Sequence, residues 1–247
     1  MESRIAKEID VRYMDTAFSM KTNLITLLGY FNEIAQVAGD YYAQKHDIFK
    51  LDQIAWILVN WQVKILRFPI YKERLLVSTI AHAIDRFYAY RNFYIQDASG
   101  MIIAEGKSRW ILMDFAAKKA TEAREFMWDL YGVRPETSPF SIDMPVRMST
   151  EGYRTTYTVV PSDIDIYNHV NNVVYARWIC DAIGPLLTES GTLKEFRIHY
   201  KKEAALKEEI SLLSQINRDT QVHTKHLFQN EDGANLAYAC TRWEEAT

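Results

Sequence analysis

Hydrophobic residues recur at helical spacing in a long stretch near the start of the chain. Between Thr22 and Tyr42 the apolar side chains fall three and four positions apart, which predicts one amphipathic helix. The apolar residues of this predicted helix are Leu24, Leu27, Leu28, Phe31, Ile34 and Ala35. The stretch Asn171–Leu187 has the same character and predicts a second helix.

Alternating apolar and polar residues follow each helix and predict strands. In the first half these strands are Ala55–Ile65, Arg74–Ile84, Tyr88–Ile95 and Ile102–Met113. In the second half they are Lys194–Tyr200, Glu209–Asn217, Val222–Phe228 and Ala234–Trp243. A helix followed by a run of antiparallel strands is an α+β pattern, and we expect each sheet to wrap around its helix.

The two halves also repeat each other in detail. Glycine, alanine, a small hydroxyl residue, arginine and tryptophan recur at identical spacing in Gly100–Trp110 and Gly233–Trp243. Residue 233 thus corresponds to residue 100. A weaker similarity joins Val11–Asp15 to Val160–Asp165, 150 residues further on, with an acidic residue closing both. A repeat of this length indicates a duplicated domain. We expect an N-terminal domain over residues 1–131, a proline-containing linker over 132–149 and a C-terminal domain over 150–247.

Composition narrows the class of protein further. The 48% hydrophobic content suffices for a core, and a net charge of −3 gives no electrostatic footprint for nucleic acid. Cys180 and Cys240 follow no metal or redox spacing, and we expect free core thiols. The histidines show no ligand spacing, so neither a metal nor a cofactor is expected. Because no apolar run is long enough to span a bilayer, a soluble cytoplasmic protein is the default expectation.

Candidate chemistry is concentrated between Asp163 and Asn172. This segment holds two carboxylates, one histidine and three amide side chains: Asp163, Asp165, His169, Asn168, Asn171 and Asn172. One interpretation is an elaborate helix cap, because Asp and Asn satisfy free N–H groups at helix starts. The other is an enzyme site, in which Asp165 and His169 approach each other across a turn. Spacing alone leaves both interpretations open.

The motif Asp165-x-x-x-His169-Val-Asn-Asn, followed by Tyr200-x-x-Glu203, resembles the acyl-ACP thioesterases, which consist of two tandem hotdog domains. Segments Val11–Asp15 and Trp56–Trp61 also resemble their counterparts in bacterial members. The resemblance implies hydrolysis of fatty acyl-acyl carrier protein (ACP) to free fatty acid and holo-ACP. Acyl carrier protein would be the partner, and the protein would act as a monomer or homodimer.

Carried over to this sequence, the family's catalytic residues fall on Asp165, His169 and Glu203. The family's catalytic asparagine normally stands two residues before the histidine, where this chain has Tyr167. We expect Asn168 to take that role, with the Tyr167 hydroxyl as the alternative. A cysteine that follows the glutamate in plant members is Ala204 here.

The chemistry assigns roles to several of these residues. Either Asp165 or Glu203 would act as general base or nucleophile, and backbone N–H groups near Val170–Asn172 are candidates for an oxyanion site. Asn171 and Asn172 either hold that turn in shape or contact the substrate. Asp163 is expected to cap the turn.

The first copy lacks the matching groups, because Ser19 aligns with His169 and Phe68 with Glu203. We therefore expect one active site per chain, with the first domain supplying most of the acyl pocket. Candidate acyl-binding residues are Leu24, Leu28, Phe31 and Trp56. A basic approach surface for the acidic carrier protein could come from Lys64, Arg67 and Lys72 or from Lys201, Lys202 and Lys207.

Other functions share the same residues. An acyl-CoA thioesterase would use an identical site, and a double hotdog without catalysis could bind acyl groups. The second alternative gains little from two carboxylates in one pocket, because burying them without chemistry is costly. A hotdog hydratase fits the motif less well.

Overall fold

The computed structural model describes residues 4–17, 19–45, 54–143, 148, 151–166, 168–184, 191–218 and 221–244. The chain folds as two compact units, residues 1–142 and 143–247. Residues 132–142, which belong to the predicted linker, pack with the first unit, where the Phe140 ring contacts the rings of His82 and Tyr90.

The first unit consists of one long helix, a five-stranded antiparallel sheet and short accessory elements. In chain order these are β1 (Ile5–Asp10), the 3-10 helix η1 (Tyr13–Asp15), α1 (Leu24–Lys45), β2 (Ile54–Ile65), β3 (Arg74–Ile84), β4 (Tyr88–Gln96), β5 (Ile102–Asp114), β6 (Lys119–Ala120) and α3 (Phe126–Tyr131). The strands are ordered β1-β3-β4-β5-β2, and β6 pairs with β5.

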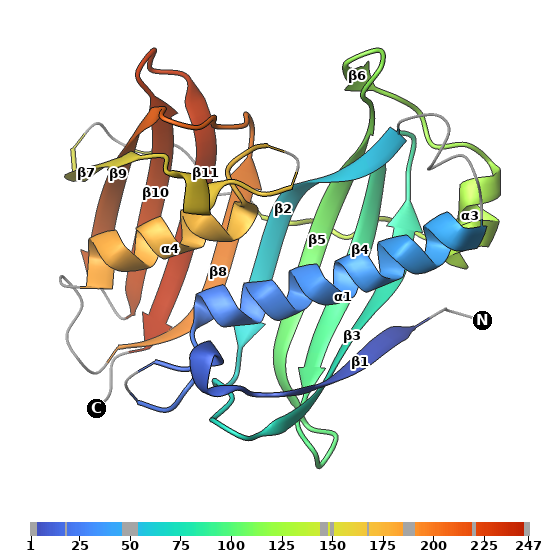
Figure 1. The fold of residues 1–247 in the computed structure, drawn as a ribbon, viewed down its shortest axis with the longest axis horizontal. Coiled ribbons are helices and arrows are strands. Elements are labelled where there is room, and N and C mark those ends of the chain that lie inside the picture. Colours follow the sequence, from blue (N-terminus) through green and yellow to red (C-terminus); the bar gives the residue numbers. More distant parts are fainter. Residues whose placement is uncertain are drawn as a thin grey trace. The chain divides into compact units, whose positions relative to one another are not determined.

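Helix α1 lies across one face of this sheet (Figure 1). Five of the six apolar positions that predicted the helix are buried, and the sixth, Ala35, is half-buried. Phe31 packs against Trp61 and Phe93 with ring centroids 5.6 and 5.4 Å apart. Gly106 of β5 makes this approach possible, since a Cβ there would stand 3.0 Å from the Phe31 ring. The predicted helix and strands are confirmed with small shifts at their ends, whereas α3 was not predicted.

The second unit repeats this plan with a shorter helix. Its elements are β7 (Tyr153–Thr158), the 3-10 helix η2 (Pro161–Asp163), α4 (Asn172–Ile183), β8 (Thr192–Tyr200), β9 (Glu209–Arg218), β10 (Val222–Asn230) and β11 (Asn235–Glu244). The strands are ordered β8-β11-β10-β9-β7, all antiparallel. The predicted helix was longer, but α4 ends at Ile183, and residues 185–190 lie outside the described part of the chain.

The repeated hairpin is confirmed bond by bond. In the first unit the Gly100 N–H donates to the Asp97 carbonyl at 2.9 Å, and in the second the Gly233 N–H donates to the Asn230 carbonyl at 2.9 Å. Both glycines have positive φ, 83° and 73°, which favours glycine at each turn. The two units are therefore copies of one α+β architecture. None of the described helices is long and apolar enough to cross a membrane.

Candidate active site

The motif that holds Asp165 and His169 forms a tight loop between η2 and α4. The Asp165 N–H donates to the His169 carbonyl at 2.9 Å, and the Asn168 N–H donates to the Asp165 carbonyl at 3.0 Å. Asn168 occupies the left-handed region with φ of 66°, which asparagine tolerates better than most residues. The His169 N–H also points at Asp165 Oδ1, at a long 3.4 Å. The turn predicted between Asp165 and His169 is therefore present.

The end of β8 meets this loop through the backbone. The Val170 N–H donates to the Ala204 carbonyl at 3.1 Å, which places the preceding residue, Glu203, beside His169. His169 Nε2 lies 2.9 Å from Glu203 Oε2. The two side chains are 39% and 59% exposed, so the pair is open to solvent. Because an ionised carboxylate only accepts, Nε2 carries the hydrogen in this contact.

Asp163 stabilises the loop through both its carboxylate and its backbone carbonyl. Its buried carboxylate accepts from the Val160 N–H at 3.0 Å and from the Arg177 guanidinium of α4 at 2.6 Å, and its carbonyl accepts from the Asn171 N–H at 2.8 Å. The predicted capping role of Asp163 is confirmed. The ion pair to Arg177 was missed, because the two residues are fourteen positions apart with no pattern linking them.

Several groups at the start of α4 are engaged in structural bonds. The Asn171 side chain caps the helix by accepting from the Val173 N–H at 3.1 Å, and the Tyr200 hydroxyl donates to the Asn172 carbonyl at 2.9 Å. Since the N–H groups of Val170 and Asn171 donate to Ala204 and Asp163, they are not available to an oxyanion. The oxyanion site predicted near Val170–Asn172 is therefore wrong for the N–H groups of Val170 and Asn171, and it stays a prediction for that of Asn172.

Family models cover nearly the whole chain. Residues 2–131 match the acyl-ACP thioesterase N-terminal domain, and residues 147–245 match the acyl-ACP thioesterase C-terminal domain. The chain belongs to the acyl-ACP thioesterase family. Among curated relatives, the chloroplastic palmitoyl-acyl carrier protein thioesterase of Cuphea hookeriana is 23% identical over 85% of this chain. The match covers 53% of that relative, so the chain spans about half its length.

Solved structures of acyl-ACP thioesterases share the fold. A Lactobacillus plantarum protein provisionally described as an oleoyl thioesterase superposes with a TM-score of 0.89 at 20% identity, covering 100% of this chain and 98% of that one. The 12:0-ACP thioesterase of Umbellularia californica superposes with a TM-score of 0.82 at 17% identity, covering 98% of both chains. The two tandem hotdog domains expected from the sequence are confirmed.

The first hotdog domain of this family member carries a degenerate copy of the loop. The Ala17 N–H donates to the Lys21 carbonyl at 2.9 Å, as Asp165 does to His169, and Met20 has a left-handed φ of 57°, as Asn168 has. Buried Asp15, which ends η1, thus corresponds to Asp163, which ends η2. These pairs stand 148 positions apart (residue 15 against residue 163), so the predicted offset of 150 is wrong.

This correction changes the aligned residues. Lys21, and not Ser19, occupies the position of His169, and Ala17 occupies that of Asp165. The match of Phe68 with Glu203 is confirmed, because the Thr22 N–H donates to the Pro69 carbonyl in the way that Val170 donates to Ala204. The first copy therefore lacks the aspartate, the histidine and the glutamate.

The remaining predicted residues lie as follows. Leu24, Leu28 and Phe31 are fully buried in the first core, and the Trp56 Nε1–H donates to the Tyr131 hydroxyl at 3.0 Å. Their contact with an acyl chain stays a prediction, as does that of Asn172. Tyr167 lies outside the described residues.

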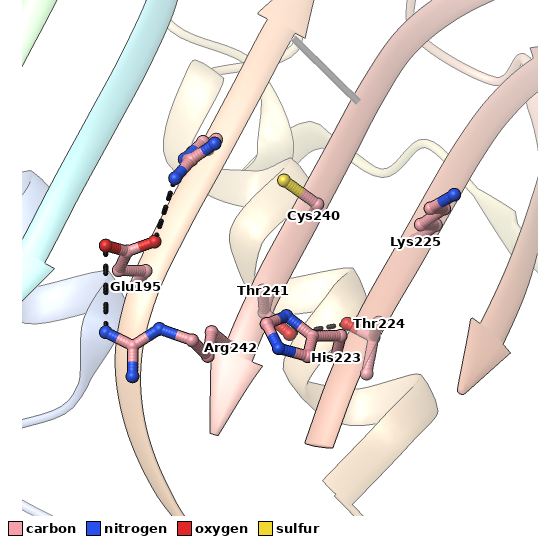
Figure 2. Close-up of a pocket in the computed structure, with 8 residues that line it drawn as sticks. Glu195, His223, Thr224, Lys225, Cys240, Thr241 and Arg242 are labelled. Carbon is pink, nitrogen blue, oxygen red and sulfur yellow. Dashed lines mark hydrogen bonds and ion pairs between the residues drawn. The ribbon is translucent and has the colours of Figure 1, made fainter. Parts of the chain in front are cut away.

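A separate pocket of about 230 Å³ is lined by residues of β8, β10 and β11 and by none of the loop before α4 (Figure 2). Glu195 stands between two guanidiniums there, 3.0 Å from Arg197 and 3.6 Å from Arg242. Burial raises the pKa of the neighbouring Cys240 thiol. Within the described part of the chain, no cluster of His, Cys, Asp and Glu could hold a metal ion.

Proposed function

We propose that this chain hydrolyses the thioester of fatty acyl-ACP and releases a free fatty acid and holo-ACP. The observation that carries the proposal is the contact between Glu203 and His169. His169 lies on the same loop as Asp165. In the relatives named above, the same reaction class is part of the protein's name. The reaction would take place in the compartment that holds the carrier protein.

The His169–Glu203 pair supplies the base. Glu203 accepts the Nε2–H and fixes the imidazole, which leaves Nδ1 with its lone pair for a water molecule. Nδ1 takes a proton as the water oxygen attacks the thioester carbonyl carbon. The C–S bond then breaks, the electron pair goes to sulfur, and the thiolate takes the proton back from the imidazolium. Glu203 stabilises the imidazolium in between, which is the role of a carboxylate beside a catalytic histidine.

The oxyanion is stabilised by a side chain in this proposal. The backbone N–H groups of Val170 and Asn171 are engaged, while the Asn168 side chain is exposed at the tip of the turn. The Asn168 amide can donate to the carbonyl oxygen as charge develops, one residue from the position that the family uses. Asp165 provides a second carboxylate on the same loop, where its Oδ1 faces the His169 backbone N–H.

An isotope experiment distinguishes attack by water from nucleophilic attack by Asp165. In a single turnover in H₂¹⁸O, water attack puts ¹⁸O into the first fatty acid released. Attack by Asp165 would instead expel the thiolate and form a mixed anhydride. Water that opens this anhydride at the aspartyl carbonyl would leave an unlabelled oxygen in the fatty acid and put ¹⁸O into the Asp165 carboxylate. Unlabelled product from the first turnover would therefore overturn the base mechanism while leaving the hydrolase in place.

The carrier protein has a basic approach to this site within the same domain. Lys201 and Lys202 are exposed and immediately precede Glu203 on the chain. Acyl carrier protein is acidic, so these lysines offer a complementary contact next to the reacting thioester. Such charges mainly raise the rate of association and make it sensitive to salt.

The test compares acyl-ACPs with the matched acyl-CoAs over a range of chain lengths. We expect a higher kcat/KM for the carrier substrates, and a selective loss of that preference in Lys201→Gln/Lys202→Gln. A preference for acyl-CoA would change the proposed substrate class and leave the proposed mechanism unchanged. Absence of turnover on both classes would contradict the proposed activity.

A further inference from the structure

In the first unit the degenerate loop keeps the backbone of the catalytic loop but presents a different surface. Its side chains form an apolar-basic patch that we define by Tyr13, Met14, Met20, Lys21, Ile70, Tyr71 and Lys72. The catalytic groups of the second unit are absent from this surface.

The apolar members of the patch are unusually exposed. Met14 is 85% exposed, Tyr13 68%, Ile70 51% and Met20 43%. A side chain with this much exposure projects from the surface and contributes little to the core. Exposed apolar groups gathered in one place indicate an interaction site, whereas single ones need no explanation.

Contacts between its members show that the patch is continuous. The Tyr13 and Tyr71 rings meet edge to face with centroids 6.2 Å apart, and the Tyr71 N–H donates to the Met20 carbonyl at 2.9 Å. Lys21 pairs with Ile70 in an isolated β-bridge. The residues thus come from three segments, η1, the degenerate loop and the turn before β3, that are tied to one another.

The second unit shows that this backbone does not require apolar side chains. Under the structural alignment, Ser162 stands in place of Met14, Asn168 in place of Met20 and Ala205 in place of Ile70. The matching bonds include the N–H of residue 70 to the Glu73 carboxylate at 2.9 Å and the N–H of Ala205 to the Glu208 carboxylate at 2.8 Å. At these three positions the apolar side chains of the first unit are therefore not demanded by the fold.

Positive charge borders the apolar groups. Lys21 and Lys72 are exposed, and the Lys72 Nζ stands 5.3 Å from the centroid of the Tyr71 ring. The nearby carboxylates are engaged elsewhere: Asp15 accepts from Arg12 and from the Tyr30 hydroxyl, and Glu73 pairs with Arg67 at 2.6 Å. Within the described residues neither lysine forms an ion pair.

We propose that the apolar-basic patch binds the surface of an anionic lipid bilayer. Projecting Met and Tyr side chains can enter the boundary between headgroups and acyl chains without a shaped cavity, and lysines attract anionic headgroups. A second protein is a poorer fit, because a stable protein interface takes roughly 20–30 residues a side and this patch has seven. The attachment is weak and reversible, and it does not depend on the proposed hydrolysis.

The test is co-sedimentation of the full chain with vesicles of phosphatidylglycerol and phosphatidylcholine, against phosphatidylcholine alone. We expect binding to the anionic vesicles only, weakened by salt. The triple variant Met14→Ser/Met20→Asn/Ile70→Ala carries the residues that the second unit uses on the same backbone, so it should fold. It should bind at least roughly tenfold more weakly, and Lys21→Gln/Lys72→Gln should lose roughly fivefold per lysine.

The matched control is Met101→Ser, which removes a 63% exposed methionine from the turn between β4 and β5. This variant should bind vesicles as the wild type does. Absence of vesicle binding by the wild type would overturn the proposal. So would equal losses in the triple variant and the control. A dimer, or a complex with acidic carrier protein, that the triple variant abolishes while vesicle binding is unchanged would assign the patch to that partner instead.

Discussion

His169 Nε2 lies 2.9 Å from Glu203 Oε2, although the two residues come from different elements of the second unit. His169 belongs to the loop before α4, and Glu203 follows the end of β8. The bond from the Val170 N–H to the Ala204 carbonyl holds these two segments in register. The pair proposed as the base is thus positioned by this backbone contact and not by its own attraction alone.

A single active site per chain predicts a sharp contrast between two equivalent positions. His169→Gln should lower kcat/KM for acyl-ACP by about 10²- to 10⁴-fold, because it removes the base. Lys21→Gln, at the same place in the first unit, should leave hydrolysis in solution within about twofold. Steady-state kinetics on one acyl-ACP checks both, and a comparable loss in the two variants would show that the first copy takes part in the chemistry.

The buried carboxylate of Asp163 predicts a stability effect of its partner. Arg177→Met should lower the free energy of unfolding on the order of 2–3 kcal/mol, because Asp163 is left buried with one fewer donor. Arg86→Met is the matched control, since Arg86 and Glu122 form an exposed pair, and it should cost clearly less than Arg177→Met. Urea unfolding measures both. Equal costs would mean that Arg177 contributes no more than a surface ion pair.

Buried His226 predicts a pH dependence of stability. Burial lowers its pKa to about 3, while Ser214 and Thr224 occupy its two ring nitrogens. Below the ordinary histidine pKa of about 6.5 the unfolded chain binds a proton that the folded chain does not, so stability falls as pH falls toward about 3. This residue alone should cost about 2 kcal/mol between pH 7 and pH 5.

The measurement is urea unfolding at several pH values in that window. The variant His226→Phe carries the residue that the first unit has at the equivalent position, Phe93. It should be less stable than the wild type at pH 7, but its stability should fall less steeply as the pH is lowered. His223→Gln is the control, because His223 is exposed, and it should keep the slope of the wild type. An unchanged slope in His226→Phe would place the pH dependence elsewhere.

Backbone angle predicts opposite signs for two glycine substitutions. Gly233→Ala should destabilise by about 1–2 kcal/mol, because φ is 73° there although an added Cβ would meet nothing within 4 Å. Gly39→Ala, also in open space but within α1, should stabilise by roughly 0.5–1 kcal/mol. Thermal unfolding gives both shifts. Destabilisation by both would mean that contacts, and not backbone angles, decide.

Patterns that depend on neighbours in the chain were predictable from the sequence. The hairpins at Gly100 and Gly233 were recognised because turn geometry and strand alternation are local. The approach of Asp165 to His169 needed only one tight turn. Placing Glu203 beside them needed the family resemblance, since the two segments meet through a contact between distant parts of the sequence.

The errors have the same origin. Two acidic residues, Asp163 and Asp165, stand two positions apart, and sequence similarity alone matched the wrong one to Asp15. The bonds of the Val170 and Asn171 N–H groups are made with Ala204 and Asp163, so the supposed oxyanion donors were engaged by contacts that no local pattern reveals. The ion pair of Arg177 was missed for the same reason.

The most direct test of the central claim is the kcat/KM of Glu203→Gln on an acyl-ACP, beside Glu231→Gln in the turn between β10 and β11 as control. If Glu203 holds His169 as the base, Glu203→Gln should lose about 10²-fold or more while the control stays near wild type. Wild-type turnover by Glu203→Gln, with the His169 variant inactive, would contradict the paired base.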